Sequence, residues 1–503
     1  MTQPLPDEIL PDARPGGRAR PGAGWPRRTA SILVPAAALL ALAAASPALA
    51  QVAADAAPAA APVVEAAAPV ADKGDTAWVM ISAILVMMMT LPGLALFYGG
   101  LVRSRNVLSV LMQVLTVFAV IAILWVVFGY SLAFTGAGTA ADATATTPFI
   151  GGLSKAFLGG ITTSSLAETF SAGVFIPEFA FAVFQMAFAC IAGALIVGAT
   201  AERMKFVAIL AFVVIWFVFS YLPMAHMVWW WGGPSAFDAP SGFLFGHGAL
   251  DFAGGTVIHI NAGVAGLVAA MVAGPRIGYR KELMAPHNLT LTMVGGCLLW
   301  IGWFGFNAGS NLEANGLTAL AIINTAVATA AAALAWAAGE WAMRGHPSLL
   351  GGVSGAVAGL VGVTPAAGFV GPMGAIAIGV AAGLICMWVV VSLKSRIGID
   401  DSLDVFGIHG VGGIVGAILT GVFAAPSLGG TGVYDYAAGA VAEFSMGSQV
   451  YAQALGVVIC VLWSGIVSFV AIHLVRVTVG LRVSPTDERQ GLDLTTHGEN
   501  AYN

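Results

Sequence analysis

Between about residue 75 and residue 476 the chain alternates long apolar runs with shorter polar stretches. A helix that crosses a bilayer needs about 20 predominantly apolar residues, and eleven of these runs are long enough to qualify. The pattern therefore predicts an all-α polytopic membrane protein with eleven transmembrane helices. The expected helices lie near residues 76–101, 107–134, 177–200, 206–229, 254–274, 289–307, 317–343, 349–364, 371–393, 405–424 and 450–476.

The composition points to the same class of protein. Hydrophobic residues make up 58% of the chain and charged residues only 9%, and the mean hydropathy is +0.90. A soluble fold has too little interior for so much apolar surface, so the solvent must be lipid. The net charge of −5 resides in tails and loops and forms no basic patch, so we expect no nucleic-acid partner. The cysteines lie in apolar runs as small hydrophobes, and we expect no disulfide, metal site or cofactor: Cys190, Cys297, Cys386 and Cys460.

The first fifty residues have the pattern of a targeting segment. Arg18, Arg20, Arg27 and Arg28 precede an apolar run from Ile32 to about Ala45, and small residues follow at 46–50. We expect a signal peptide over residues 1–50, cleaved before Gln51. An uncleaved first helix is the alternative, but the run is shorter than the roughly 20 residues that a span needs. Residues 51–74, rich in Ala, Pro and Val, are expected to form a flexible exported linker.

Positive charge is divided unevenly between alternate loops. One set of loops carries ten Lys and Arg residues, whereas the opposite loops between helices carry only Lys155. By the positive-inside rule the first set is cytoplasmic. In a bacterial inner membrane the amino terminus is then exported, residues 75–476 form the membrane domain, and residues 477–503 form a cytoplasmic tail. The ten residues are Arg103, Arg105, Arg203, Lys205, Arg276, Arg280, Lys281, Arg344, Lys394 and Arg396.

This orientation predicts the behaviour of reporter fusions. Because the charge of alternate loops sets orientation, a reporter fused after Asn503 should be active in the cytoplasm. One inserted in the loop of residues 136–171 should be active on the exported side. Enzyme reporters that work on only one side of the membrane make the measurement, and the opposite pattern would overturn the count of eleven helices.

Two stretches share an Asp, an Ile-His pair and two glycines at the same spacing, 150 residues apart. Each places an ionisable imidazole, His259 or His409, within an apolar run. Paired halves of membrane transporters usually meet around a central pathway near the bilayer midplane, so we expect the two histidines to face each other. Two unrelated packing histidines are the alternative. The matched positions are Asp251 with Asp401, His259 with His409, Gly263 with Gly413, and Gly266 with Gly416.

Seven motifs follow one another in a specific order. They are FQMAFACI from Phe184, GATAER from Gly198, AHMVW from Ala225, ALDFAGGTVIHIN from Ala249, WFGFNAGS from Trp303, DVFGIHG from Asp404 and GLDLTTHGENAY from Gly491. In this order they resemble the ammonium transporter (Amt) family of the Amt/Mep/Rh superfamily, from about residue 76 to the end. The resemblance implies a homotrimer whose eleven-helix subunits each enclose a pore between two inverted five-helix halves, with a last peripheral helix. The loop after Trp229 is longer here than in compact members.

The resemblance implies an outer recruitment site for ammonium at Phe184, Trp229 and Ser310. Ammonium matches potassium in size and charge, so its selection has to use its protons. Aromatic faces attract a cation by about 0.5–2 kcal/mol, and the Ser310 hydroxyl can accept an N–H. Simple anchoring at the membrane interface is the alternative role for Trp229.

Phe188 and Phe306 match the family's stacked phenylalanine gate. A charge driven between apolar rings is penalised by several kcal/mol, whereas neutral ammonia is not. Removing a proton from ammonium costs about 1.36 kcal/mol per pH unit below its pKa, or roughly 3 kcal/mol for two units. Deprotonation is therefore the cheaper route. Ordinary helix packing is the alternative for the two rings.

His259 and His409 would then line the narrow part of the pore. A neutral imidazole accepts and donates at once, so two of them sharing a hydrogen bond can bind ammonia and relay a proton. Two roles are open for Asp251, a helix N-cap and a direct cation ligand, and we favour the cap. Structural roles are expected for Trp303, Asn261, Asn307, Asp400, Asp401 and Asp404.

The carboxyl-terminal tail resembles the segment by which family members touch neighbouring subunits and respond to a P-II nitrogen regulatory protein. The matching residues are Gly491, Asp493, His497 and Gly498. The expected partners are therefore ammonium or ammonia, two further copies of the chain, the lipid bilayer and a P-II protein at the cytoplasmic face.

Three classes of function remain to be compared. Ammonium transport leads, either as electrogenic uptake or as passive conduction of ammonia gas, and Trp229 favours the electrogenic form because related Rhesus proteins lack its equivalent. An ammonium sensor acting through a P-II protein is second, but sensor fusions carry a large output domain and only 27 residues follow Arg476. An intramembrane enzyme is third, and no His-Glu-x-x-His, Gly-x-Ser-x-Gly or P-loop motif supports it. We expect a transporter rather than an enzyme.

Overall fold

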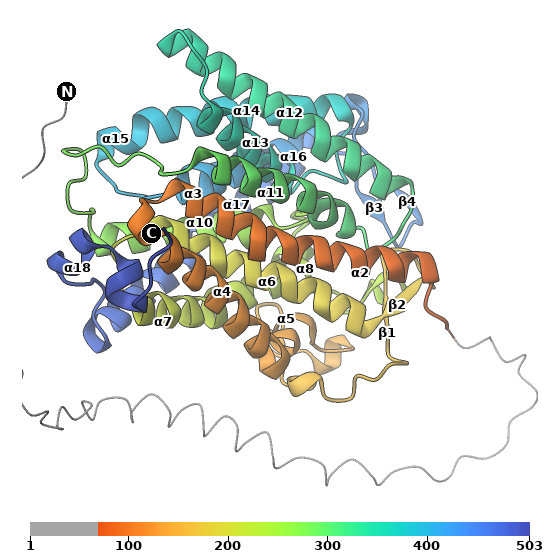
Figure 1. Ribbon diagram of the computed structural model, residues 1–503. Helices are drawn as coiled ribbons and strands as arrows, with labels where there is room; N and C mark the ends of the chain where they lie inside the picture. Colours follow the sequence, from red (N-terminus) through yellow and green to blue (C-terminus); the bar gives the residue numbers. More distant parts are fainter. Residues whose placement is uncertain (1–68, 503) are drawn as a thin grey trace, which may run out of the picture. The chain divides into compact units, whose positions relative to one another are not determined.

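The computed structural model describes residues 69–502 (Figure 1). The predicted signal peptide and most of the predicted linker, residues 1–68, lie outside the described residues. The first helix, α2, begins at Lys73, and the Asp72 carboxylate accepts a hydrogen bond from the N–H of Asp75 at 2.9 Å. An Asp at this position satisfies a free N–H of the first turn and so fixes where the helix starts. The last two residues of the predicted linker are therefore helical.

Ten helices within residues 69–502 are long and apolar enough to cross a membrane. They coincide, within a few residues, with ten of the eleven predicted spans. The eleventh prediction, 349–364, corresponds to α13 (Leu349–Val363), which is apolar but only 15 residues long. The predicted all-α polytopic fold is confirmed. The ten spans are Lys73–Leu101, Ser104–Phe134, Glu178–Thr200, Phe206–Trp229, Gly255–Ala273, Leu289–Gly309, Gly316–Arg344, Pro372–Ile397, Phe406–Phe423 and Met446–Thr478.

Six of these spans contain a wider π-helical turn. Pro92 explains the first, because proline has no N–H to continue the ladder of an α-helix. Four turns join two α-helices and two begin a helix, and turns of this kind often occur at functional sites. The joined pairs are α2 (Lys73–Met88) with α3 (Ala95–Leu101), α4 (Val107–Leu124) with α5 (Tyr130–Phe134), α7 (Phe206–Trp216) with α8 (Leu222–Trp229), and α14 (Pro372–Trp388) with α15 (Lys394–Ile397). The turns η8 (Gly255–Ile260) and η10 (Phe406–Gly410) begin α10 (Asn261–Ala273) and α16 (Val411–Phe423).

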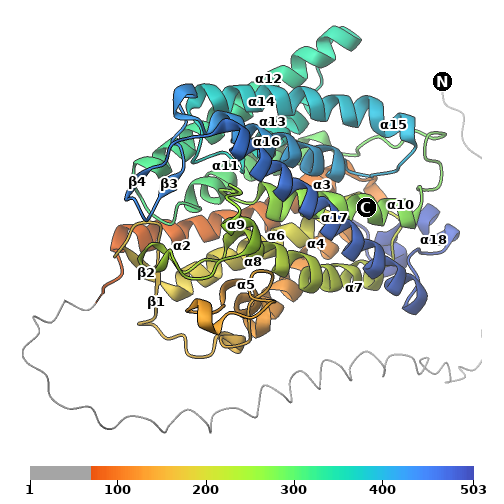
Figure 2. The ribbon, with the colours of Figure 1, turned by 180° about the vertical axis from the view of Figure 1, so that it is seen from behind.

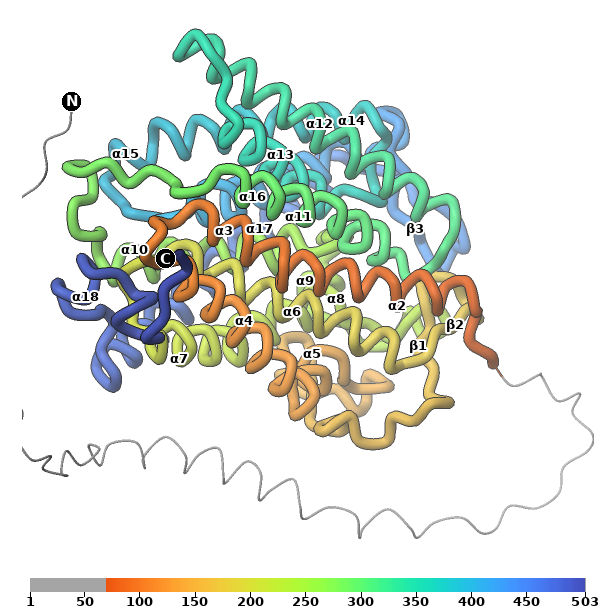
Figure 3. The backbone as a smooth tube through the Cα atoms, viewed as in Figure 1, coloured from red at the N-terminus to blue at the C-terminus, as the bar shows by residue number. Residues whose placement is uncertain are grey.

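Two helices form the centre of the described chain. In α6 (Glu178–Thr200) and in the span that ends with α10, 83% and 78% of the most apolar stretch is buried. On one side α12 (Gly316–Arg344), α13 and α14 pack together, and α11 (Leu289–Gly309) connects them to α2 and α3 (Figures 1 and 3). The long α17 (Met446–Thr478) packs on α10, α16 and α7 and runs across the face seen in Figure 2. The centre of the bundle is therefore α6 and α10, with α17 at its periphery.

Short elements connect the spans. β1 (Leu166–Glu168) pairs with β2 (Phe175–Pro177), and β3 (Tyr434–Asp435) pairs with β4 (Ala440–Val441), both antiparallel. Ala71 pairs with Phe175, so the segment before α2 joins the first hairpin. Two short α-helices, α9 (Phe243–Gly246) and α18 (Pro485–Gln490), also lie outside the spans. Strands of two or three residues are too short to leave an alternating pattern, so the sequence did not predict them.

Buried ion pairs lie at the carboxyl-terminal end of α6, which is the end away from the hairpins. Glu202 pairs with Arg103 at 2.9 Å and with Arg276 at 3.0 Å, and Arg276 pairs with Asp400 at 2.8 Å. Burial alone would raise the pKa of Glu202 and of Asp400, but their arginine partners outweigh it and hold each pKa below its usual value. The two carboxylates therefore stabilise the fold at neutral pH, and that stabilisation is lost as the pH falls through the lowered pKa values. The loops with the predicted cytoplasmic charges thus pack against one another.

Candidate functional site

His259 and His409 meet in the interior. His259 lies in η8 and His409 in η10, so both precede a helix by the same short π-helical turn. Their Nδ1 atoms are 3.2 Å apart, and the rings stack with centroids 5.3 Å apart and planes 19° apart. Both side chains are buried. The predicted 150-residue repeat therefore brings two imidazoles into direct contact.

The repeated glycines allow this contact. A Cβ at Gly263 would lie 2.4 Å from the backbone nitrogen of Gly410, and a Cβ at Gly413 would lie 2.9 Å from the carbonyl oxygen of Gly255. Each of these glycines is four residues beyond a histidine, which is one helical turn. The two helices thus cross backbone to backbone beside the imidazole pair, and no larger residue fits at either position.

Asp251 and Asp401 hold the starts of the two histidine-bearing segments. The Asp251 carboxylate accepts four backbone hydrogen bonds of 2.6–3.1 Å, and the Asp401 carboxylate accepts two, at 2.8 and 3.1 Å. A carboxylate offers about four acceptor positions, so Asp251 has none left for a cation. This is the geometry of an N-cap rather than of a direct ligand. The donors to Asp251 are the N–H groups of Gly254, Gly255, Thr256 and Val257.

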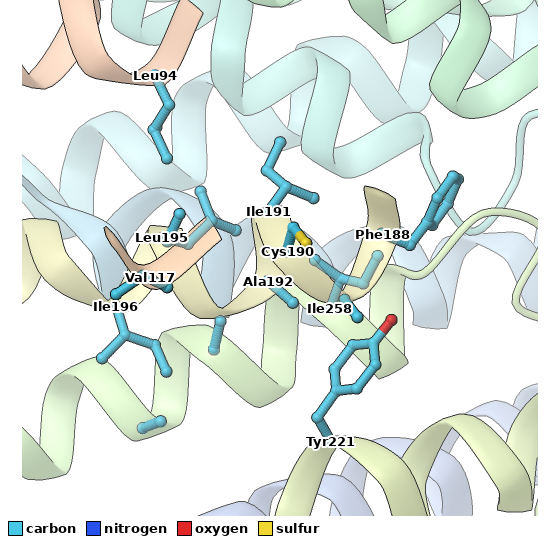
Figure 4. Close-up of a cluster of buried hydrophobic side chains, with 14 of the residues drawn as sticks. Leu94, Val117, Phe188, Cys190, Ile191, Ala192, Leu195, Ile196, Tyr221 and Ile258 are labelled. Atoms are coloured by element: carbon cyan, nitrogen blue, oxygen red, sulfur yellow. The ribbon is translucent and has the colours of Figure 1, made fainter. Parts of the chain in front are cut away.

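A series of aromatic rings leads to the histidine pair. Phe188 and Phe306 stack face to face, with centroids 4.3 Å apart and planes 11° apart, and both are buried. The ring of Trp229 meets Phe188 edge-on at 6.1 Å, and Phe306 lies 5.8 Å from His259. Figure 4 shows Phe188 at one end of a run of apolar side chains on α6, with Ile258 of η8 beside them. The rings of Phe188 and Phe306 thus form a buried apolar contact next to His259.

The three residues predicted for the outer site are not equally accessible. Trp229 and Ser310 are half-buried, whereas Phe184 is fully buried and packs on Phe188 at 4.7 Å. The Trp229 indole N–H donates to the carbonyl oxygen of Asp251 at 2.9 Å, and the Ser310 hydroxyl donates to that of Phe306 at 2.8 Å. Trp229 and Ser310 are therefore partly accessible, whereas Phe184 supports the Phe188 ring from within the protein.

The predicted supporting residues form polar contacts around the pair. The Trp303 ring stacks on His259 at 5.4 Å, and its N–H donates to the hydroxyl of Thr364 at 2.9 Å. Asn307 donates to Thr325 at 2.9 Å. Asp404 lies apart from this group and pairs with Lys394. No sequence motif marked Thr364. The one hint in the sequence was that the apolar run ending at this residue is unusually short.

The tail folds back on the ends of its own helices. Asp493 accepts a hydrogen bond from the N–H of Ser109 at 2.7 Å, at the start of α4, and is buried. Gly491 lies so close to Arg105 that a Cβ would come within 2.6 Å of its backbone oxygen. The His497 ring meets Phe206 edge-on at 5.4 Å, and Gly498 ends the last turn with φ +71°. These contacts dock the tail on this chain itself.

All four cysteines are free thiols, three of them buried and Cys297 exposed on α11. Within residues 69–502 no group of three or more His, Cys, Asp or Glu side chains could hold a metal ion.

Fold and site together define a polytopic helical membrane protein in which buried, stacked aromatic rings contact a pair of histidines. The model of the Ammonium Transporter Family matches residues 77–502. The ammonium transporter of Bacillus subtilis is 45% identical over 433 residues, covering 85% of this chain and 98% of that protein. The ammonium transporter of Aquifex aeolicus is also 45% identical, over 432 residues, covering 86% of this chain and 94% of that protein. The chain belongs to the ammonium transporter family.

Solved structures agree with this assignment. Mep2 of Saccharomyces cerevisiae superimposes with a TM-score of 0.70 at 32% identity, covering 82% of this chain and 88% of that one. A structure titled "Sensor Amt Protein" gives a TM-score of 0.73 at 28% identity, covering 84% of this chain and 98% of that one. The fold is thus shared by Mep2 and by a protein whose title describes it as a sensor.

Proposed function

We propose that this protein takes up ammonium electrogenically, by deprotonating it at the outer side and passing ammonia and the proton inward separately. The observation that carries the proposal is the unbroken order of contacts from Trp229 through Phe188 and Phe306 to His259 and His409. The first ring attracts the cation and Ser310 accepts one of its N–H groups. The stacked phenylalanines then exclude water, so the bare cation meets a barrier that ammonia does not.

The histidine contact supports a proton relay. An Nδ1···Nδ1 hydrogen bond requires a proton on one Nδ1 and a lone pair on the other, because each neutral imidazole carries a single N–H. The Nε2 atoms are then unlike: one is an acceptor and the other a donor. His259, beside the gate, has a buried Nε2 without a protein partner. A proton accepted there shifts the shared proton to His409, which releases its own from Nε2 on the inner side.

A flux measurement tests the proposal. Liposomes containing the purified protein should accumulate ammonium faster than protein-free liposomes, and potassium at the same concentration should not enter. Equal ammonium entry into both kinds of liposome would contradict the proposal. Passive conduction of ammonia gas is the nearest alternative, and it differs by moving no net charge.

A sensor role is the second candidate, favoured by the likeness to a protein titled as a sensor and by the docked tail. In this role the ammonium-dependent state of the pore would be passed to a P-II protein at the cytoplasmic face. The two roles are compatible, because a chain that transports ammonium can also bind a P-II protein through its tail.

We further propose a homotrimer in a bacterial inner membrane, with the tail cytoplasmic and regulated by a P-II protein. The docked tail supports this, because Leu492 donates to Asn106 at 2.8 Å and Glu488 accepts the N–H of Ile277 at 2.7 Å. Deleting residues 480–503 removes these contacts and should leave a folded trimer whose transport is reduced or no longer regulated. Flux assays and a pull-down with a P-II protein make the measurement.

A shorter truncation is the matched control for the tail. Removing residues 499–503 leaves Gly491, Asp493 and His497 docked, so it should leave flux and regulation nearly unchanged. If the long deletion alters neither flux nor P-II binding, the tail is a solvated terminus without a regulatory role.

A further inference from the structure

Trp303 forms the wall against which His259 lies. The indole and imidazole planes are 19° apart and their centroids 5.4 Å apart, so the indole limits how the imidazole can turn. Trp303 also contacts Phe306 of the gate at 5.4 Å. A rotation of the indole would therefore disturb both the gate and the histidine pair.

A single hydrogen bond fixes the indole. Its N–H donates to the hydroxyl oxygen of Thr364 at 2.9 Å, and both side chains are fully buried. Away from water an unpaired N–H costs about 1–3 kcal/mol, so the indole is oriented by the position of that oxygen. The Thr364 hydroxyl has two buried acceptors for its own proton, the carbonyl oxygen of Leu360 at 2.8 Å and the side-chain oxygen of Asn307 at 3.3 Å. A lone pair on the Thr364 oxygen is therefore what accepts the Trp303 N–H.

Thr364 occupies a fixed position because α13 ends just before it. The next residue, Pro365, accepts the N–H of Phe252 at 3.2 Å, and a Cβ at Gly255 would lie within 2.6 Å of the proline ring. Gly255 is the first residue of η8, the turn that carries His259. The backbone next to Thr364 therefore packs against the start of η8, the turn that carries His259.

The hydroxyl also connects to neighbouring helices. Thr364 lies 3.3 Å from the side-chain oxygen of Asn307 on α11, and Asn307 donates to Thr325 on α12 at 2.9 Å. Thr325 donates to the carbonyl oxygen of Ala321 at 2.7 Å. The polar contacts therefore link α11, α12 and the end of α13, and they end on the backbone carbonyls of Leu360 and Ala321.

We propose that Thr364 is a positioning residue for the proton relay: its hydroxyl holds the Trp303 indole, and the indole holds the His259 ring in line with His409. The inference rests on the proposed function. Among the described residues Thr364 makes no hydrogen bond to His259 or His409, so it acts through Trp303. Its loss should lower the maximal rate and leave recruitment at the outer surface unchanged.

The test compares variants of the full-length protein in liposomes. Thr364→Val keeps the shape and removes the acceptor, and it should lower the maximal ammonium current about tenfold, equivalent to about 1.4 kcal/mol, with an unchanged half-saturating concentration. Thr364→Ser restores the acceptor and should return the current to within about twofold of wild type. Thr420→Val is the control, because the Thr420 hydroxyl is equally buried but donates only to Gly416 of its own helix, at 2.8 Å.

Trp303→Phe tests the same hydrogen bond from the other side. It removes the N–H, so adding Thr364→Val to it should cause no further loss. Should Thr364→Val fail to assemble, Trp303→Phe alone must reproduce the tenfold loss. Normal current in Trp303→Phe, or a Thr364→Val loss that persists in its background, overturns the inference. Absence of ammonium flux in the wild type would instead overturn the proposed function, and this inference with it.

Discussion

Replacing either His259 or His409 with leucine should abolish ammonium-driven current while the protein still assembles. Within the described residues each ring hydrogen-bonds only to the other, through Nδ1 atoms 3.2 Å apart, so each is the other's route for passing a proton. Removing a group that transfers a proton typically costs about 100-fold or more in rate. Leucine fills a similar volume and donates nothing, so packing survives and the relay does not. Current recordings from liposomes, with size-exclusion chromatography for assembly, make the measurement.

Two further variants make this result specific. His473 lies on α17, is partly exposed, and among the described residues bonds only to the carbonyl oxygen of Phe469 on its own helix, so His473→Leu should leave the current unchanged. An acidic replacement, His259→Glu, attracts cations outright and should weaken discrimination against potassium. Full current and normal selectivity in both leucine variants would leave the histidines as packing residues.

Replacing Asp251 with alanine should destabilise the protein more than any other single change to a polar group of the site. Four backbone N–H groups at the start of η8 lose their acceptor, and losing even an ordinary N-cap costs about 0.5–2 kcal/mol. Because this cap is buried, each unsatisfied N–H adds to that cost, and we expect a total of about 3 kcal/mol or more. Thermal unfolding in detergent measures the loss.

The repeat supplies the matched control for this variant. Asp401 caps the equivalent turn but accepts only two backbone N–H groups, so Asp401→Ala should cost about half as much. The comparison also separates the two roles that the sequence left open for Asp251. If Asp251→Ala keeps wild-type stability and loses only transport, the carboxylate is a cation ligand and the cap assignment is wrong.

The sequence predicted the positions of the helices better than the hydrogen-bonding pattern inside them. Apolar runs marked the spans to within a few residues because lipid requires a continuous apolar surface. The same runs could not reveal the π-helical turns of η8 and η10, since these change the hydrogen bonding and leave the composition as it was. The start of α2 at Lys73 was missed for a similar reason, because one Asp cap outweighed a linker-like composition.

At the site, the repeat predicted that His259 and His409 would meet, and the motifs predicted which rings would surround them. The repeat did not show that Gly263 and Gly413 are the points where the two helices touch, because a close approach is a property of two chain segments at once. Nor did any motif mark Thr364, whose importance lies in one hydroxyl at the end of a short helix. A single buried threonine carries no pattern along the sequence.

The central claim is that this pore moves ammonium with net charge through a histidine relay. Current recorded from proteoliposomes during a rapid step of ammonium tests it most directly, with a potassium step of the same size as the reference. We expect an inward current that follows the ammonium step, is absent with potassium, and disappears in His259→Leu. Entry of ammonia that raises the internal pH without any current would contradict it.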